Sequence, residues 1–284
     1  MRFLKYGKRI LMIFALLILV GISFIYISEY FIKRDIRYTP SYQQIDLTPI
    51  LNKETLLESD YKLLFYQTGL GKRAIDELIK KNNGHKQIIQ FQTDFFKEIS
   101  ITTNKTDFTT GQYVGQDGIR ENGFTLAPYQ DGYVFLTQSS YTVGWRHGHA
   151  GIVTDSYRQQ VLEAKTLGVS SQITPAQKWQ QRPTFIMLRL KTSQEELDQI
   201  ADFAEEHMAD QIYRLLIGLT SKKNPKPENL GGTNCSHLVY YPFKQFGFDI
   251  DSDGNWLVTP NDIMNSDLFE VVQIYGLDPK DFWP

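Results

Sequence analysis

The spacing of apolar positions changes twice along the chain and divides it into three parts. The stretch from residue 11 to 28 is predominantly apolar and carries no charge. Between residues 53 and 98, apolar positions recur at helical spacing, which predicts helices over 53–67, 72–82 and 86–98. From about Gly111 onward, short β-rich runs separated by turn residues replace the helical pattern.

The second half of the chain mixes strand patterns with helix patterns. The β-rich runs predict strands over residues 133–138, 149–154, 160–165, 184–191 and 268–275. Ser193, followed three residues later by Glu196, predicts a capped helix. A further apolar helical segment begins near Cys235 and is closed by Gly247. This order of elements predicts an α+β fold.

The charge-free N-terminal stretch is long enough to raise the question of a membrane span, because about 20 apolar residues cross a bilayer as a helix. Four basic residues precede it without an acid. It ends in bulky residues rather than in the small residues of a cleavage site, which favours an uncleaved signal anchor over a cleaved signal peptide. We therefore expect a cytoplasmic basic tail over 1–9, a transmembrane helix over 10–28 and an extracytoplasmic body, in a single-pass protein of the cell membrane.

The rest of the chain is expected to form a linker and helical leader over 29–110 and one folded domain over 111–284. Apolar residues make up 42% and aromatic residues 13%, which is enough to bury a core and excludes general disorder. Lys and Arg number 30 against 32 Asp and Glu. Without a basic surplus we expect no nucleic-acid partner. A single cysteine also excludes a disulfide framework and a Cys-rich zinc module.

That cysteine, Cys235, is the first candidate for chemistry. It precedes an apolar helical pattern, so it should lie in the first turn of a helix, where free N–H groups and the helix dipole stabilise a thiolate. In an exported body a lone thiol calls for a chemical role, because thiols outside the cytoplasm usually pair.

A nucleophilic cysteine also needs an imidazole and a group that orients it. His237 is two residues from Cys235 and therefore about 200° away around the helix. His149 opens a predicted strand, and a hairpin that turns near Ser156 places Glu163 opposite His149 on the same face. On spacing alone, an ordinary strand carboxylate remains a slightly better interpretation of Glu163.

Two other groupings suggest metal ions, and neither is complete. His147 and His149 share one face of a strand, but no further ligand cluster supports a metal pair. Asp249, Asp251 and Asp253 resemble the start of a calcium loop, yet Pro260 stands where the last acidic ligand belongs. We therefore expect an acidic turn, no metal and no cofactor.

Four segments in a fixed order resemble a known family. They are GHAGIV at 148–153, VLEA at 161–164, NCSHLVY at 234–240 and TPND at 259–262. The series resembles the permuted papain-like amidases, in the YiiX/YebB-like branch related to NlpC-type cell-wall hydrolases. The resemblance covers roughly residues 133–269, and 61–70 (YKLLFYQTGL) resembles the leader of Gram-positive members. It implies a circularly permuted papain-like domain with an antiparallel sheet and a nucleophile helix.

The resemblance also implies roles for individual residues. Cys235 would be the nucleophile, His149 the base and Glu163 the group that orients His149. Tyr213 would lie near the oxyanion, and Asn234 is a further candidate for contact with the substrate or oxyanion. The polar segment 221–232 is longer than the family pattern.

The function implied is a cysteine hydrolase that opens an amide through an acyl-enzyme, in peptidoglycan stem peptides. One alternative is a lipid or ester acylhydrolase or acyltransferase of the same fold, acting on a lipid-derived substrate. Another is a surface binding module that keeps the fold without using the thiol.

Overall fold

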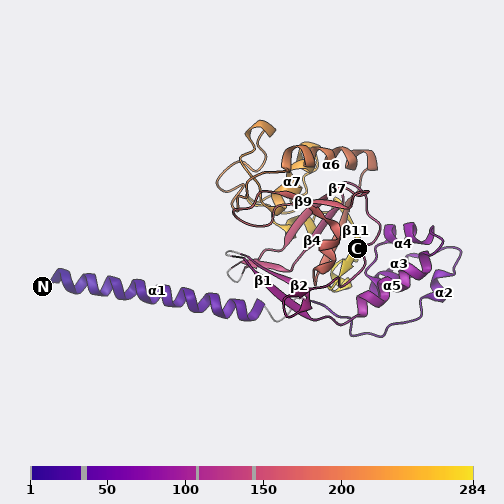
Figure 1. Ribbon diagram of the computed structural model, residues 1–284, viewed down its shortest axis with the longest axis horizontal. Coiled ribbons are helices and arrows are strands. Elements are labelled where there is room, and N and C mark those ends of the chain that lie inside the picture. Colours follow the sequence, from indigo (N-terminus) through magenta and orange to yellow (C-terminus); the bar gives the residue numbers. More distant parts are fainter. Residues whose placement is uncertain (1, 33–36, 107–108, 143–144, 284) are drawn as a thin grey trace.

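Two antiparallel β-sheets form the centre of the molecule (Figure 1). The computed structural model describes residues 2–32, 37–106, 109–142 and 145–283. Within them, the larger sheet has six strands, in the order β11 (Phe269–Tyr275), β10 (Phe185–Leu190), β4 (Val134–Thr137), β7 (His149–Asp155), β8 (Gln160–Glu163) and β9 (Gln172–Pro175). All neighbouring strands are antiparallel. The fold is thus a mixture of helices and antiparallel sheets.

The strands expected from the β-rich runs all lie in this sheet, with ends that differ by at most two residues. The smaller sheet has no counterpart among the expectations. Its strands are β1 (Ile101–Lys105), β2 (Thr110–Gln116), β3 (Ile119–Arg120), β5 (Ser140–Thr142) and β6 (Trp145–Arg146). They are short and rich in polar residues, so they lack the apolar alternation that marks a half-buried strand. Because β1 and the start of β2 precede residue 111, the β-region begins earlier than expected.

Helices from the second half of the chain cover the middle of the larger sheet. α6 (Gln194–Met208) and α7 (Cys235–Gln245) pack on β7 and on each other (Figure 1). The Ser193 hydroxyl accepts a hydrogen bond from the Glu196 N–H, as a capped helix requires. The remaining short helices of this region are α8 (Pro260–Met264), η1 (Ala176–Gln181), η2 (Pro227–Asn229) and η3 (Pro279–Asp281).

The helical leader packs on the edge of the larger sheet at β11. It consists of α2 (Thr48–Leu51), α3 (Glu58–Thr68), α4 (Lys72–Ile79) and α5 (Gly84–Phe96). The loop between α3 and α4 pairs with β11: the Gly71 N–H donates to the Val272 carbonyl at 2.8 Å, and the Ile274 N–H donates to the Gly69 carbonyl at 2.7 Å. A Cβ at Gly69 or Gly71 would lie 2.2 Å or 1.9 Å from a β11 carbonyl oxygen, so both positions require glycine.

The N-terminal helix corrects one expectation. α1 (Arg2–Ile32) is 31 residues long. In the part of the chain that the structure describes, no helix combines the length and the apolar character needed to cross a membrane. The expected transmembrane helix over 10–28 is therefore wrong for this fold.

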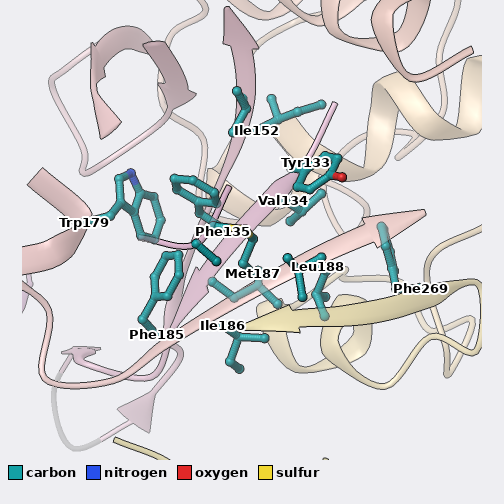
Figure 2. Packing of buried hydrophobic residues seen from close by; sticks show 14 of the residues in the cluster. Tyr133, Val134, Phe135, Ile152, Trp179, Phe185, Ile186, Met187, Leu188 and Phe269 are labelled. Atoms are coloured by element: carbon teal, nitrogen blue, oxygen red, sulfur yellow. The ribbon is translucent and has the colours of Figure 1, made fainter. Parts of the chain in front are cut away.

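Aromatic side chains fill the core between the larger sheet and the segment that follows β9. Figure 2 shows Trp179, Phe135 and Phe185 packed together. The Phe135 ring centroid lies 5.7 Å from that of Trp179 and 5.1 Å from that of Phe185, both in edge-to-face geometry. Such contacts fix ring orientation as well as burying area. They hold η1, which carries Trp179, against the strands β4 and β10.

Candidate active site

Cys235 is the first residue of α7 and is placed by its neighbours in the chain. The Asn234 side chain caps the helix by accepting a hydrogen bond from the His237 N–H at 2.8 Å. The Ser236 hydroxyl donates to the Val258 carbonyl at 2.6 Å, which fixes the first turn to the loop before α8. Cys235 retains 6% exposure. The sulfur thus lies at a helix N-terminus whose free N–H groups favour a negative charge.

His149 and Glu163 lie on neighbouring strands, in a register different from the expected one. Glu163 pairs with Gly151 rather than with His149, because the hairpin turns over residues 156–159, beyond Ser156, and the register shifts by one residue between Val153 and Asp155. The change of two residues keeps both side chains on one face. The diagonal contact is close: Nε2 of His149 lies 2.7 Å from Oε2 of Glu163.

The two ring nitrogens of His149 have separate partners. An ionised carboxylate only accepts hydrogen bonds, so Nε2 carries the hydrogen and donates the bond to Glu163. The ring also makes a hydrogen bond with the Cys235 side chain, for which Nδ1 is the nitrogen left. The structure therefore brings the three residues together in the order Cys235, His149, Glu163.

Both oxygens of Glu163 are occupied. Oε1 accepts a hydrogen bond from the Thr174 hydroxyl on β9, and Nζ of Lys165 lies 3.1 Å from the same oxygen. Oε2 serves His149. This buried carboxylate therefore has partners on β7, on β9 and in the segment directly after β8, and they orient it toward His149.

The indole of Trp179 covers one face of the His149 ring. The ring centroids are 5.3 Å apart, and the planes differ by 9°. Gly151, two residues along the same strand, makes room for the indole, since a Cβ there would lie 2.9 Å from Cζ2 of Trp179. Residues 149–151 (HAG) thus combine the imidazole with the space for the ring that orients it.

The electrostatics of Cys235 and His149 favour a charge-separated pair. Burial by itself raises the pKa of Cys235, but the His149 hydrogen bond and charge, with N–H groups of Ala150 and Ser236, outweigh burial and lower it. Burial by itself lowers the pKa of His149, but hydrogen bonds to Cys235 and Glu163 and their charges raise it. Thiolate and imidazolium therefore stabilise each other.

The Glu163 carboxyl group stays ionised at neutral pH. Burial opposes its charge, yet the hydrogen bond and charge of His149, together with Lys165 and Thr174, lower the pKa of Glu163 to about 2. An ionised carboxylate at this position stabilises the imidazolium and fixes the tautomer of the neutral ring.

Tyr213 and Asn234 have different surroundings. Tyr213 is held beside the start of α7 by a parallel bridge to Thr233, and burial and the Cys235 charge raise the pKa of its hydroxyl. Asn234 is committed to the fold: Oδ1 accepts from the His237 N–H, and Nδ2 donates to the Leu215 carbonyl at 3.1 Å. Tyr213 lines the same cleft and recess as Cys235, whereas the Asn234 amide holds the helix and the loop before it.

His237 is a structural residue of the long segment 221–232. Its Nε2 donates to the Lys223 carbonyl at 2.8 Å, and Nδ1 lies 3.0 Å from the Thr233 hydroxyl. Burial lowers the pKa of His237 to about 4, so the ring is neutral at pH 7. The Tyr241 hydroxyl adds a hydrogen bond to the Pro225 carbonyl at 2.9 Å. Helix α7 thus fastens the inserted segment on the side away from the thiol.

The groupings that suggested metal ions are also accounted for. His147 makes contacts through both ring nitrogens, with the Thr142 hydroxyl at 3.0 Å and the Gly148 carbonyl at 2.7 Å. Carboxylates of Asp251, Asp253 and Asp262 lie within 4.8 Å of one another. The Lys223 ammonium already supplies a cation to Asp251. We assign no metal to either grouping.

Cys235 opens onto a cleft of about 290 Å³ whose walls come from both sheets. His149, Glu163, Trp179 and Tyr213 also line it. A second recess of about 40 Å³ adjoins the same cysteine and is lined by apolar side chains that include Trp145, Leu215, Leu257 and Val258. The thiol therefore lies between the larger cleft and a smaller apolar recess.

Several residues of the site were not expected from the sequence. Lys165 follows Glu163 by two residues in an extended segment, so its position on the same face was a usable signal. Thr174 and Trp179 carry no such local mark. Their place depends on the pairing of β9 with β8 and on the packing of η1.

Comparisons of this chain with protein-family models, with curated proteins and with solved structures gave no match.

Proposed function

We propose that this chain is a cysteine hydrolase that opens amide bonds, related to the permuted papain-like amidases. The observation that supports it most is the buried series Cys235, His149 and Glu163, with the thiol at a helix N-terminus. The strand that carries the histidine precedes the helix that carries the cysteine, as the resemblance requires. In this proposal Cys235 is the nucleophile, His149 the acid–base group and Glu163 the positioning residue.

The chemistry follows from these positions. The Cys235 thiolate attacks the carbonyl carbon, and the π electrons of the carbonyl move to its oxygen. The His149 imidazolium gives its proton to the leaving nitrogen as the C–N bond breaks, which leaves a thioester and a free amine. Neutral His149 then takes a proton from water, which attacks the thioester. The C–S bond then breaks and its electrons return to sulfur, so the acid is released and the Cys235 thiolate and His149 imidazolium are restored.

The negative oxygen of the intermediate needs hydrogen-bond donors. Tyr213 lines the cleft and the recess next to Cys235, and its hydroxyl keeps its proton at neutral pH because its pKa is raised. We assign it to the oxyanion, together with N–H groups of the first turn of α7. The Asn234 side chain, which caps the helix, is not assigned to it.

For the substrate we propose amides of peptidoglycan stem peptides, and we place the catalytic body outside the cytoplasm, where that polymer lies. The test is to incubate the full-length protein with purified peptidoglycan and to identify the released fragments and new amino groups by mass spectrometry. Cys235→Ala is the matched control. Protease accessibility in intact cells tests the location. Unchanged peptidoglycan, with a reactive thiol in the same preparation, would exclude this substrate.

The apolar recess supports a second candidate, a lipid or ester acylhydrolase. Beside this recess, Leu215 is 43% exposed, and the nearby chain carries the exposed side chains of Leu216, Leu219 and Trp256. Such a surface suits an acyl chain. Fatty acid release from phospholipid vesicles, absent in Cys235→Ala, would favour this candidate over the amidase. A well-folded protein with an unreactive thiol would favour a binding module.

A further inference from the structure

The cleft beside Cys235 is lined by an excess of positive charge. Its cationic side chains are Arg120, Lys165, Lys178 and Arg182. Among the described residues that line it, Glu163 is the single acid, and its two oxygens are already used by His149, Thr174 and Lys165. Among the described lining residues, Lys165 is paired with Glu163, and no acid of the lining is left for Arg120, Lys178 and Arg182.

Arg182 stands out among these cations because it is buried. Its residue exposure is 9%, and Nη1 has no hydrogen-bond partner in the part of the chain that the structure describes. A buried guanidinium donor without a partner is costly, since it has lost water and gained no acceptor. Such a group is expected to meet an acceptor that arrives from the cleft.

The guanidinium is held in a way that leaves its hydrogen-bond donors free. Arg182 lies over the Tyr113 ring, 4.4 Å from its centroid, and Arg120 lies over the same ring at 3.6 Å. A cation–π contact fixes the plane of the group without using its N–H donors. The planar fork of an arginine matches the two oxygens of a carboxylate.

Arg182 is also tied to the catalytic histidine through one short element. It follows η1 directly, and its N–H donates to the Trp179 carbonyl at 3.0 Å. Trp179 is the residue that stacks on His149. A group bound by Arg182 is therefore held at a fixed distance from the reacting thiol.

We propose that Arg182, with Arg120 beside it, binds a carboxylate of the substrate, so that the hydrolase selects peptides that carry a negative charge near the scissile amide. This inference rests on the proposed function of Cys235. It adds a specificity that the catalytic residues alone do not have. Stem peptides with a free carboxylate would be preferred over the same peptides in amidated form.

The test uses alkylating probes that need no turnover. N-bromoacetyl derivatives of glycine, diglycine and triglycine, each as free acid and as C-terminal amide, place a carboxylate at increasing distance from the reactive carbon. At one spacer length we expect the acid to alkylate Cys235 about 10–100-fold faster than its amide, the range for a charge-assisted hydrogen bond. Arg182→Gln should remove this preference, and Arg182→Lys should keep part of it. Arg158→Gln, which removes an exposed arginine outside the cleft, is the matched control and should retain it.

The outcomes separate the two proposals. Equal rates for acid and amide at every spacer, or a preference that survives Arg182→Gln, would overturn the carboxylate site while leaving the hydrolase intact. No alkylation of Cys235 by any probe would overturn the hydrolase itself and the inference with it. Faster reaction of bromoacetyl-ethanolamine phosphate than of every carboxylate probe would reassign the site to a phosphate and favour the lipid candidate.

Discussion

The Trp179 indole and the His149 imidazole lie stacked, with centroids 5.3 Å apart and planes 9° from parallel. Phe135 and Phe185 support the indole from the core. This contact keeps water from one face of the histidine and therefore strengthens its hydrogen bond to Glu163. The orientation of the His149–Glu163 pair is thus set partly by Trp179, a core aromatic residue from another segment of the chain.

The thiol of Cys235 should ionise below the value of about 8.5 for a free cysteine, because His149 and the N–H groups of the helix start stabilise its charge. Alkylation by iodoacetamide should therefore be rapid at neutral pH and should abolish hydrolysis. His149→Ala should slow alkylation at neutral pH and move its midpoint to higher pH. The rate as a function of pH measures both. A midpoint near the free value that His149→Ala leaves unchanged would show that Cys235 and His149 do not form a catalytic pair.

Glu163→Gln should lower activity by about 10–1,000-fold without unfolding the protein, because it removes the charge that stabilises the imidazolium. With a pKa of about 2, Glu163 is ionised at every pH where the protein is assayed, so the loss should be present across the pH range. Steady-state rates with a circular dichroism check measure this. Glu195→Gln, at an exposed acid of α6, is the control. A well-folded Glu163→Gln variant with wild-type rates would reduce Glu163 to an ordinary strand carboxylate.

Gly151→Ala should lower both activity and stability. The added Cβ would lie 2.8 Å from Cγ1 of Val161 and 2.9 Å from Cζ2 of Trp179, so the indole has to move off the histidine. We expect the free energy of unfolding to fall by about 1–3 kcal/mol, as for other overpacked sites. Denaturant unfolding measures it, and Gly231→Ala, where the nearest atom is 3.8 Å away, is the control. In a Trp179→Ala background the cost of Gly151→Ala should shrink; an undiminished cost would show that the indole is not the obstacle.

The buried ring of His237 should make the protein less stable in acid. Its folded pKa of about 4 lies below the unfolded value of 6.5, so the unfolded chain takes up a proton first as the pH falls. The stability tied to a neutral His237 is present above pH 6.5 and is lost as the pH falls toward 4, by about 3 kcal/mol in total. Unfolding titrations over this range should show a drop that His237→Gln lacks. The same variant should leave the alkylation midpoint of Cys235 unchanged, and a shifted midpoint would give His237 a part in catalysis.

The sequence predicted helix starts and caps better than it predicted which segments pair or pack with one another. Cys235 at a helix start and Ser193 as a cap follow from neighbouring residues, and both are present. The shared face of His149 and Glu163 was expected from a symmetric hairpin and is present, but it depends on the register of β7 and β8. That register includes a one-residue shift between Val153 and Asp155, which the local sequence does not predict.

Long-range features escaped the sequence for physical reasons. Trp179 lies within the 3₁₀-helix η1 and Arg182 follows it directly, and nothing in their local pattern shows which strand or ring they will meet. The smaller sheet consists of short polar strands whose pairing supplies their stability. The expected membrane span relied on a charge-free apolar run, the basic residues before it and its bulky end, and it was wrong, since no described helix is long and apolar enough to cross a membrane.

The pairing of Gly69 and Gly71 with β11 bears on the regulation of the proposed hydrolase activity. In an enzyme kept latent by a propeptide, the leader blocks the catalytic cleft and its removal activates the zymogen. Here no described residue of 37–98 lines the cleft, and this leader completes the edge of the sheet and shares its core. Cutting it away would expose an unpaired strand and lead to aggregation rather than activation. Latency of the proposed hydrolase would therefore have to come from outside the leader.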